Sequence, residues 1–130
     1  MNSNPTVYVE QIAGQRALRM IWQQTINPAD VPLAFESIVH YLDMVDGPVD
    51  ILVDLTRNPA IPLATTVRHT LMGPQRHRKM GRWLVVGTNR TAEAVADVIS
   101  HIGPRIAIHW FSTEEEALAA LPEAHPEPGI

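Results

Sequence analysis

Val49-Asp-Ile-Leu-Val-Asp-Leu-Thr56 is the stretch that decides the fold of this chain. Its aliphatic residues run almost without interruption from Ile51 to Leu55. Such a run predicts a strand covered on both faces, and strands of this kind lie centrally in sheets flanked by helices. The residues that follow, Thr56-Arg-Asn-Pro-Ala-Ile-Pro62, are polar or proline-rich. The stretch therefore predicts a central strand that opens at its carboxyl end into a loop, where α/β sheets bind their ligands.

Two short runs before this strand alternate apolar and polar residues. They span residues 6–12 and 17–24 and flank the turn-prone Ala13-Gly-Gln-Arg16, so they predict an antiparallel hairpin. A helix should follow between Asn27-Pro28 and Gly47-Pro48, with the Asn as its cap and the first Pro at its first position. Its sheet-facing stripe consists of Val31, Phe35, Ile38, Leu42 and Val45.

The region after the central strand is harder to interpret. A helix is expected from about Leu63 or Thr65 to Met72, where Gly73-Pro74 stops it. Residues 75–81 form either a polar connector or a continuation of that helix. A buried strand is predicted next, over residues 83–87.

The last third of the chain repeats the pattern of helix and strand. Thr91 is the expected cap of a helix that Gly103-Pro104 ends. A strand is predicted over residues 105–111. The spacing of Ser112 and Glu115 is that of a capping box. A short helix should then run to about residue 121, followed by a frayed tail over residues 122–130.

The predicted order of elements is therefore ββαβαβαβα, which makes the chain α/β. Strands that alternate with helices imply crossover connections, so we expect a mixed, mostly parallel five-stranded sheet with an antiparallel opening hairpin and helices on the sheet. A length of 130 residues suits one domain, 1–130, with an ordered core over about 6–121.

The composition excludes several classes of function. The absence of cysteine removes disulfides, thiolate metal sites and thiol nucleophiles. No apolar run approaches the roughly 20 residues of a spanning helix. Residues 1–5 lack the basic start and apolar core of a secretory signal, so a cytoplasmic location is expected.

Charge is unevenly distributed along the chain. The net charge is −4, yet residues 55–92 contain no Asp or Glu and hold seven of the ten Lys and Arg residues. The basic segment from Arg68 to Arg82, with His69 and His77, is either a surface for an anionic partner such as nucleic acid or a lipid head group, or a solvated helix face that pairs with the acidic ends of a second copy, as in a homodimer. The negative total charge and the lack of a recognised binding motif argue against nucleic acid.

The chain resembles the anti-sigma-factor-antagonist (STAS) fold and the STAS-like proteins related to the CRAL-TRIO lipid carriers. The resemblance covers about residues 6–121 and rests on the opening hairpin, the strand ending Asp54-Leu-Thr56, and the closing Trp110-Phe-Ser-Thr-Glu-Glu-Glu-Ala-Leu118. It implies a regulatory domain that acts through protein contacts. In signalling members an Asp-Ser-Ser-Gly element carries the phosphorylated serine. Here that element is missing, and Thr56, Thr65 and Thr66 are the phosphorylation candidates.

Polar side chains gather in the two loops that follow the buried strands. The candidates for binding a ligand or a partner are Asp54, Thr56, Arg57, Asn58, Thr88, Asn89 and Arg90. Asp54 suits a phosphoacceptor or a general base, or it caps its own loop by accepting backbone amides. The residues from Gly87 to Thr91 suit an anion beside a helix start, or they form an ordinary strand-to-helix loop without a dinucleotide or P-loop pattern.

Other residue types suggest sites less strongly. No His-Glu-x-x-His or comparable ligand set occurs, so no metal or other cofactor is expected. No catalytic motif is recognised either, and we expect no enzyme. Trp22, Trp83 and Trp110 lie in or beside predicted strands, where they line an apolar ligand pocket or, alternatively, belong to the core or a dimer interface. The sequence thus favours a non-enzymatic interaction module, with a carrier of a small apolar or anionic ligand as the alternative.

Overall fold

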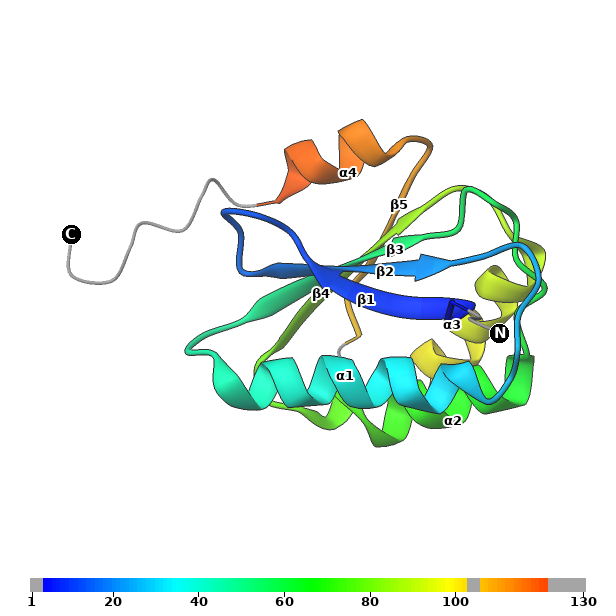
Figure 1. Cartoon of the computed structure of the whole chain (residues 1–130), viewed down its shortest axis with the longest axis horizontal. Helices are drawn as coiled ribbons and strands as arrows, with labels where there is room; N and C mark the ends of the chain where they lie inside the picture. The colour runs from blue at the N-terminus through cyan, green and yellow to red at the C-terminus, as the bar shows by residue number, and fades with distance from the viewer. Residues whose placement is uncertain (1–3, 103–105, 122–130) are drawn as a thin grey trace.

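The structure, a computed structural model, describes residues 4–102 and 106–121, and it has the predicted α/β order (Figure 1). A five-stranded sheet has four α-helices packed on its two faces. The elements are β1 (Val7–Gln11), β2 (Ala17–Trp22), α1 (Asp30–Met44), β3 (Val49–Asp54), α2 (Leu63–Met72), a 3-10 turn η1 (Pro74–Arg76), β4 (Met80–Val86), α3 (Arg90–Ile102), β5 (Ile108–Phe111) and α4 (Glu114–Ala120).

The strands lie side by side in chain order, β1-β2-β3-β4-β5. β1 and β2 pair antiparallel, and every later pair is parallel, so the expected mixed sheet is confirmed. β3 occupies the middle position, and all of its residues except Asp54 are buried. Its apolar run is therefore what a strand with helices on both sides requires.

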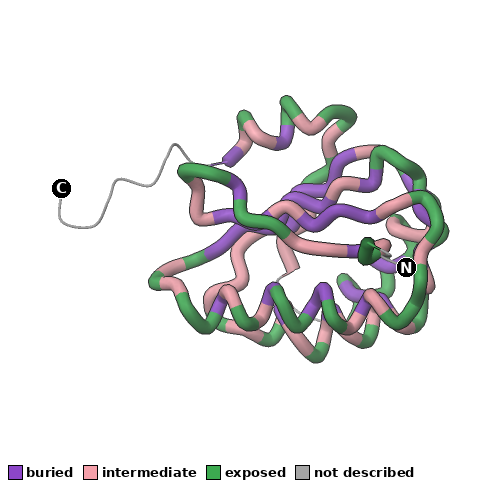
Figure 2. Tube along the Cα trace, in the orientation of Figure 1, coloured by how far each residue is buried: buried purple, intermediate pink, exposed green. Residues whose placement is uncertain are grey.

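The two faces of the sheet pack against different helices (Figure 1). α1, α2 and α3 cover one face over a core that includes Ile51 and Val53 of β3, whereas the small α4 covers the other face over a core that includes Leu52 and Ala117. The side chains of β3 thus alternate between two cores, as the pleat of a strand demands. Figure 2 shows these buried residues along the strands and on the inner side of α1.

The start of α1 differs from the prediction. The helix begins at Asp30 rather than at Pro28, because the Asn27 side chain accepts from the Ala29 amide at 3.1 Å and forms a turn before the helix. The Asp30 carboxylate accepts from the Thr6 amide and hydroxyl, each at 2.7 Å. These hydrogen bonds lower the pKa of Asp30 and join the segment before β1 to the first turn of α1.

Two other predicted caps were wrong by one or two positions. Asn89, not Thr91, caps α3, since its side-chain oxygen accepts from the Ala92 amide at 2.9 Å. In α4 the capping box is formed by Thr113 and Glu116 rather than by Ser112 and Glu115. In both cases several hydroxyl, amide and carboxyl side chains are adjacent in sequence, and the backbone path selects one of them.

The bounds of two strands also differ. Residues 75–81 are a connector and not a continuation of α2, and their last residues already belong to β4, which begins at Met80 instead of residue 83. The last strand is shorter than predicted and begins at Ile108. The predicted helix end at Gly103-Pro104, the strand residue Arg105 and the tail 122–130 lie outside the described residues.

Two arginines of the sheet hold α4 at its two ends. Arg19 of β2 contacts the Glu114 carboxylate with Nε at 3.2 Å and Nη2 at 3.1 Å. Arg82 of β4 donates to the carbonyl of Ala120 at 3.0 Å and to the carboxylate of Asp50 at 2.9 Å. Because α4 is short and covers its face of the sheet alone among the described helices, these contacts fix its position.

We predict that Arg82→Met lowers the free energy of unfolding by about 2 kcal/mol, because it leaves the largely buried Asp50 carboxylate with one fewer donor and removes a hydrogen bond to α4. Urea unfolding followed by circular dichroism measures the change. Arg78→Met is the matched control, since Arg78 is exposed. Equal unfolding curves for the two variants would contradict the proposed role of Arg82.

Candidate functional site

The carboxyl ends of β3 and β4 bring the two predicted loops together. The strands are parallel neighbours, and Asp54 of β3 lies in register with Val86 of β4. A further hydrogen bond, from the Leu55 amide to the Val86 carbonyl at 2.9 Å, extends the pairing past the end of β3. The loop after β3 and the loop after β4 therefore start side by side, as the sequence predicted from the two strand ends.

Asp54 uses its carboxylate within its own loop. One oxygen accepts from the Thr56 amide at 2.9 Å and from the Thr56 hydroxyl at 2.7 Å. The other lies 3.6 Å from the Arg57 guanidinium. This geometry is the loop-capping alternative of the sequence prediction, and it orients Thr56 and Arg57.

Asn58 and Asn89 join the two loops. Asn58 has a φ of 50°, the left-handed region that Asn tolerates better than most residues. Its side-chain oxygen accepts from Asn89 Nδ2 at 2.9 Å, and the same Nδ2 donates to the Pro59 carbonyl at 2.8 Å. Asn89 is 6% exposed and also caps α3, so one buried side chain fixes both loops and the helix start.

Gly87 allows the loops to approach closely. Its φ is +102°, and a Cβ atom at this position would lie 3.1 Å from the Leu55 carbonyl oxygen. Only glycine combines this backbone conformation with so close a neighbour. The loop after β4 can therefore turn directly over the end of β3.

Five candidate residues are exposed on this edge: Asn58, whose side chain is bound to Asn89, and Thr56, Arg57, Thr88 and Arg90. We call the last four residues the loop surface. They surround the buried Asn89 and the half-buried Asp54, and part of them borders an open polar hollow that also includes Glu93. The loop surface presents two guanidinium groups and two hydroxyl groups on a hydrogen-bonded base, an arrangement suited to polar contacts with an acidic group.

The phosphorylation candidates differ in access. Thr56 is exposed and Thr65 is half-buried in the first turn of α2. Thr66 is 6% exposed, and its hydroxyl faces the protein interior. Thr56 is therefore the most accessible of the three hydroxyl residues in the folded chain, and Thr66 is the least accessible.

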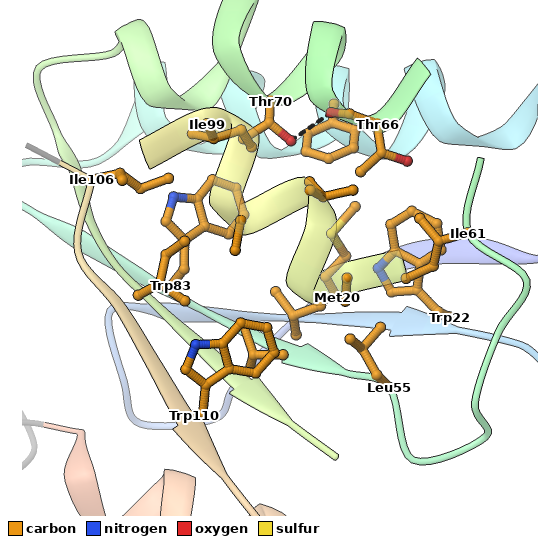
Figure 3. A pocket seen from close by; sticks show the side chains of 17 residues that line it. Met20, Trp22, Leu55, Ile61, Thr66, Thr70, Trp83, Ile99, Ile106 and Trp110 are labelled. Carbon is orange, nitrogen blue, oxygen red and sulfur yellow. Dashed lines mark hydrogen bonds between the residues drawn. The ribbon is translucent and has the colours of Figure 1, made fainter. Parts of the chain in front are cut away.

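A second feature is an apolar cavity of about 80 Å³ between the sheet and helices α2 and α3 (Figure 3). Trp22, Trp83 and Trp110 all line it, and Trp22 and Trp83 also belong to the buried core, which was the other alternative from the sequence. Thr66 and Thr70 line it as well, and sequence reasoning missed them. The signal was present, because two hydroxyl residues at a spacing of four lie on the sheet-facing side of α2.

The described residues hold no cluster of three or more His, Asp or Glu side chains that could bind a metal ion. Nor does any helix among them combine the length and the apolar character needed to cross a membrane.

An antiparallel hairpin followed by three parallel strands, with helices on both faces and a polar edge at the carboxyl ends of the strands, defines an α/β domain of the STAS type. The comparison with protein families agrees. The model of the SpoIIAA-like family matches residues 17–121, and the chain belongs to that family. A comparison with curated proteins gives no match.

We predict that Asn89→Ala lowers the free energy of unfolding by about 2 kcal/mol. The lost helix cap contributes about 1 kcal/mol, and the lost hydrogen bonds to the loop contribute about 1 kcal/mol. Hydrogen exchange should also accelerate at the amide of Asn58, which donates to the Leu55 carbonyl in the adjoining turn. Thr88→Ala is the control, because Thr88 is the exposed neighbour in the same loop. A variant with normal stability and unchanged exchange at Asn58 would refute the joining role of Asn89.

Proposed function

We propose that this chain is a non-enzymatic regulatory module that acts through a protein partner bound at the loop surface. The observation that carries the proposal is the hydrogen bond from the buried Asn89 to Asn58, which fixes the loops that carry exposed Thr56, Arg57, Thr88 and Arg90. A rigid polar surface binds with a smaller loss of conformational entropy than a flexible loop does. The membership of the SpoIIAA-like family supports a regulatory or interaction role.

The chemistry of the loop surface favours an acidic segment of the partner. Arg57 and Arg90 supply guanidinium groups that bind carboxylates in a bidentate manner, and Thr56 and Thr88 add hydroxyl groups. Asp54 is a poor candidate for a general base, because its carboxylate already accepts from the Thr56 amide and hydroxyl. This is the reason for proposing contact rather than catalysis.

A small anionic ligand at the same edge is less well supported. The Ala92 amide at the start of α3 is already bound to Asn89 Oδ1, and the exposed carboxylate of Glu93 borders the same hollow. Both features weaken the attraction for a lone anion. An extended protein surface can contact the arginines and avoid Glu93.

Thr56 is the phosphorylation site that fits this proposal. A phosphate on its hydroxyl would replace the 2.7 Å hydrogen bond to Asp54 and place two negative groups together. It would also reduce the positive character that Arg57 gives to the loop. Phosphorylation would therefore weaken the binding of an acidic partner. The cytoplasmic location remains a prediction from the sequence.

The proposal predicts that a double variant, Arg57→Glu with Arg90→Glu, loses its partner. Affinity purification from the native cells, with quantitative mass spectrometry, should recover a protein with the wild type and at least tenfold less of it with the variant. Such a loss corresponds to about 1.4 kcal/mol of binding free energy, and the reversal of two charges at the edge of an interface is sufficient to cause it.

Arg68→Glu with Arg76→Glu is the matched control, because it makes the same change in charge at exposed residues away from the loops. Circular dichroism should show that both double variants are folded. If every recovered protein depends equally on both pairs of arginines, binding is electrostatic and nonspecific, and the loop surface is not the partner site.

Homodimer formation is the second partner expectation, and the charged surfaces constrain its geometry. Exposed Arg68 and Arg76 lie on the α2 and η1 side of the sheet, whereas exposed Glu115 and Glu116 lie on α4 on the opposite side (Figure 1). Pairing of these surfaces is head to tail, and such contacts extend into chains of copies unless they close into a ring. A closed two-copy dimer requires a different, self-complementary surface.

Light scattering over a range of protein concentrations separates these cases. Pairing of the charged surfaces predicts a mass that grows beyond two copies at low salt and falls to one copy at high salt. Glu115→Lys, which leaves the capping box of Thr113 and Glu116 intact, should reduce the growth. A mass that saturates at two copies and is insensitive to salt would contradict charge pairing, and a constant mass of one copy would exclude self-association altogether.

A further inference from the structure

Two polar atoms without partners belong to side chains that line the apolar cavity. Trp22 is 2% exposed and Thr66 is 6% exposed, and both line the cavity. The Trp22 indole Nε1 and the Thr66 Oγ1 are fully buried, and neither has a hydrogen-bond partner among the described residues. Buried polar atoms nearly always have a partner, so an unpaired donor beside a cavity points to a missing molecule.

The same cavity offers an internal comparison. Trp83 also lines it, yet its indole nitrogen donates to Gln75 at 2.9 Å. Thr70 lines it one turn along α2 from Thr66, and its hydroxyl donates to the Thr66 carbonyl at 2.7 Å. The fold therefore provides partners for the polar atoms of Trp83 and Thr70 and leaves those of Trp22 and Thr66 unpaired among the described residues.

The unpaired atoms lie at one end of the cavity. Figure 3 shows Trp22, Thr66 and Ile61 grouped at that end, with Trp83, Trp110 and Ile106 at the other. Trp110 is 43% exposed, whereas Trp22 is buried, so the second end is the side that reaches the surface. A molecule that enters beside Trp110 would meet the polar atoms at the inner end.

We infer that this cavity binds a small uncharged molecule with a short hydrocarbon chain and one carbonyl or hydroxyl group, held by Trp22 and Thr66. The indole nitrogen only donates, so the ligand must carry an acceptor. No charged side chain lines the cavity, which disfavours a carboxylate or an amine because their charges would be buried unpaired.

The size of the cavity restricts the ligand further. A volume of about 80 Å³ exceeds the roughly 10–15 Å³ that one water requires, and it is smaller than the roughly 150 Å³ cavity known to hold benzene. A narrow chain that extends toward Trp110 fits this volume better than a ring does. The inference does not depend on the proposed partner at the loop surface, because the cavity is formed by different side chains.

Butanone, butanoate and butane form a matched set of probes, each small enough for this site. Proton–nitrogen correlation spectra of labelled protein follow the indole resonances of the tryptophans, and Trp22→Phe identifies the one from Trp22. We expect the ketone to move the Trp22 indole resonance downfield in a saturable manner, because that N–H gains an acceptor. Butanoate should have no effect, and butane should leave the Trp22 proton without a downfield shift.

Thr66→Val tests the second polar atom, and Thr65→Val is its control on the same helix. Loss of one neutral hydrogen bond should weaken ketone binding about tenfold in Thr66→Val and leave it unchanged in Thr65→Val. Ala96→Leu, which adds volume at a lining position, should abolish binding. The wild-type titration remains decisive if a variant fails to fold.

Three results would overturn the inference. The first is the absence of a saturable shift at Trp22 in folded wild-type protein. The second is equal affinity for butane and the ketone, or equal weakening of ketone binding by both threonine variants, since either result shows that the polar atoms do not recognise the ligand. The third is a magnetisation transfer from water to the Trp22 indole proton that persists at saturating ketone, since ordered water would then be the partner of that donor.

Discussion

The burial of β3 on both faces is the constraint on which the rest of the structure depends. Its side chains alternate between the large core under α1 to α3 and the small core under α4, so every helix of the domain packs on one side of this strand or the other. Parallel pairing with β2 and β4 then places the strand ends on one edge. The change from aliphatic residues to Asp54-Leu-Thr56 occurs at that edge, and it separates the core from the loop surface within three residues.

Much of this was predictable, because the determinants are local or periodic. The element order could be predicted from an almost uninterrupted apolar run, an amphipathic helix stripe and glycine–proline pairs that end helices. The family membership agrees with the resemblance seen at Asp54-Leu-Thr56. The exact caps were not predictable where polar residues are adjacent. Ser112 is by residue type a slightly better cap than Thr113, and only the backbone conformation at the helix start selects Thr113.

The contacts that define the sites connect residues far apart in sequence, and no spacing rule finds them. Asn58 and Asn89 were both candidates, yet nothing in the sequence indicated that one donates to the other across 31 positions. The pairing of Arg19 with Glu114 spans 95 positions. The unpaired state of Trp22 and Thr66 is less predictable still, because it depends on the absence of a partner in three dimensions. Residue types suggest which groups matter, and packing decides which of them are satisfied.

The loop after β3 belongs to both candidate sites. Leu55 and Ile61, at the two ends of this loop, line the apolar cavity, while Thr56, Arg57 and Asn58 between them lie at the exposed edge. The Asn89 side chain fixes the middle of the same loop through Asn58 and Pro59. A molecule in the cavity and a partner at the loop surface would therefore act on one short segment from opposite sides. If one of these molecules binds better to a particular position of the loop, its binding changes the affinity for the other molecule. By thermodynamic reciprocity, the second molecule changes the affinity for the first by the same factor.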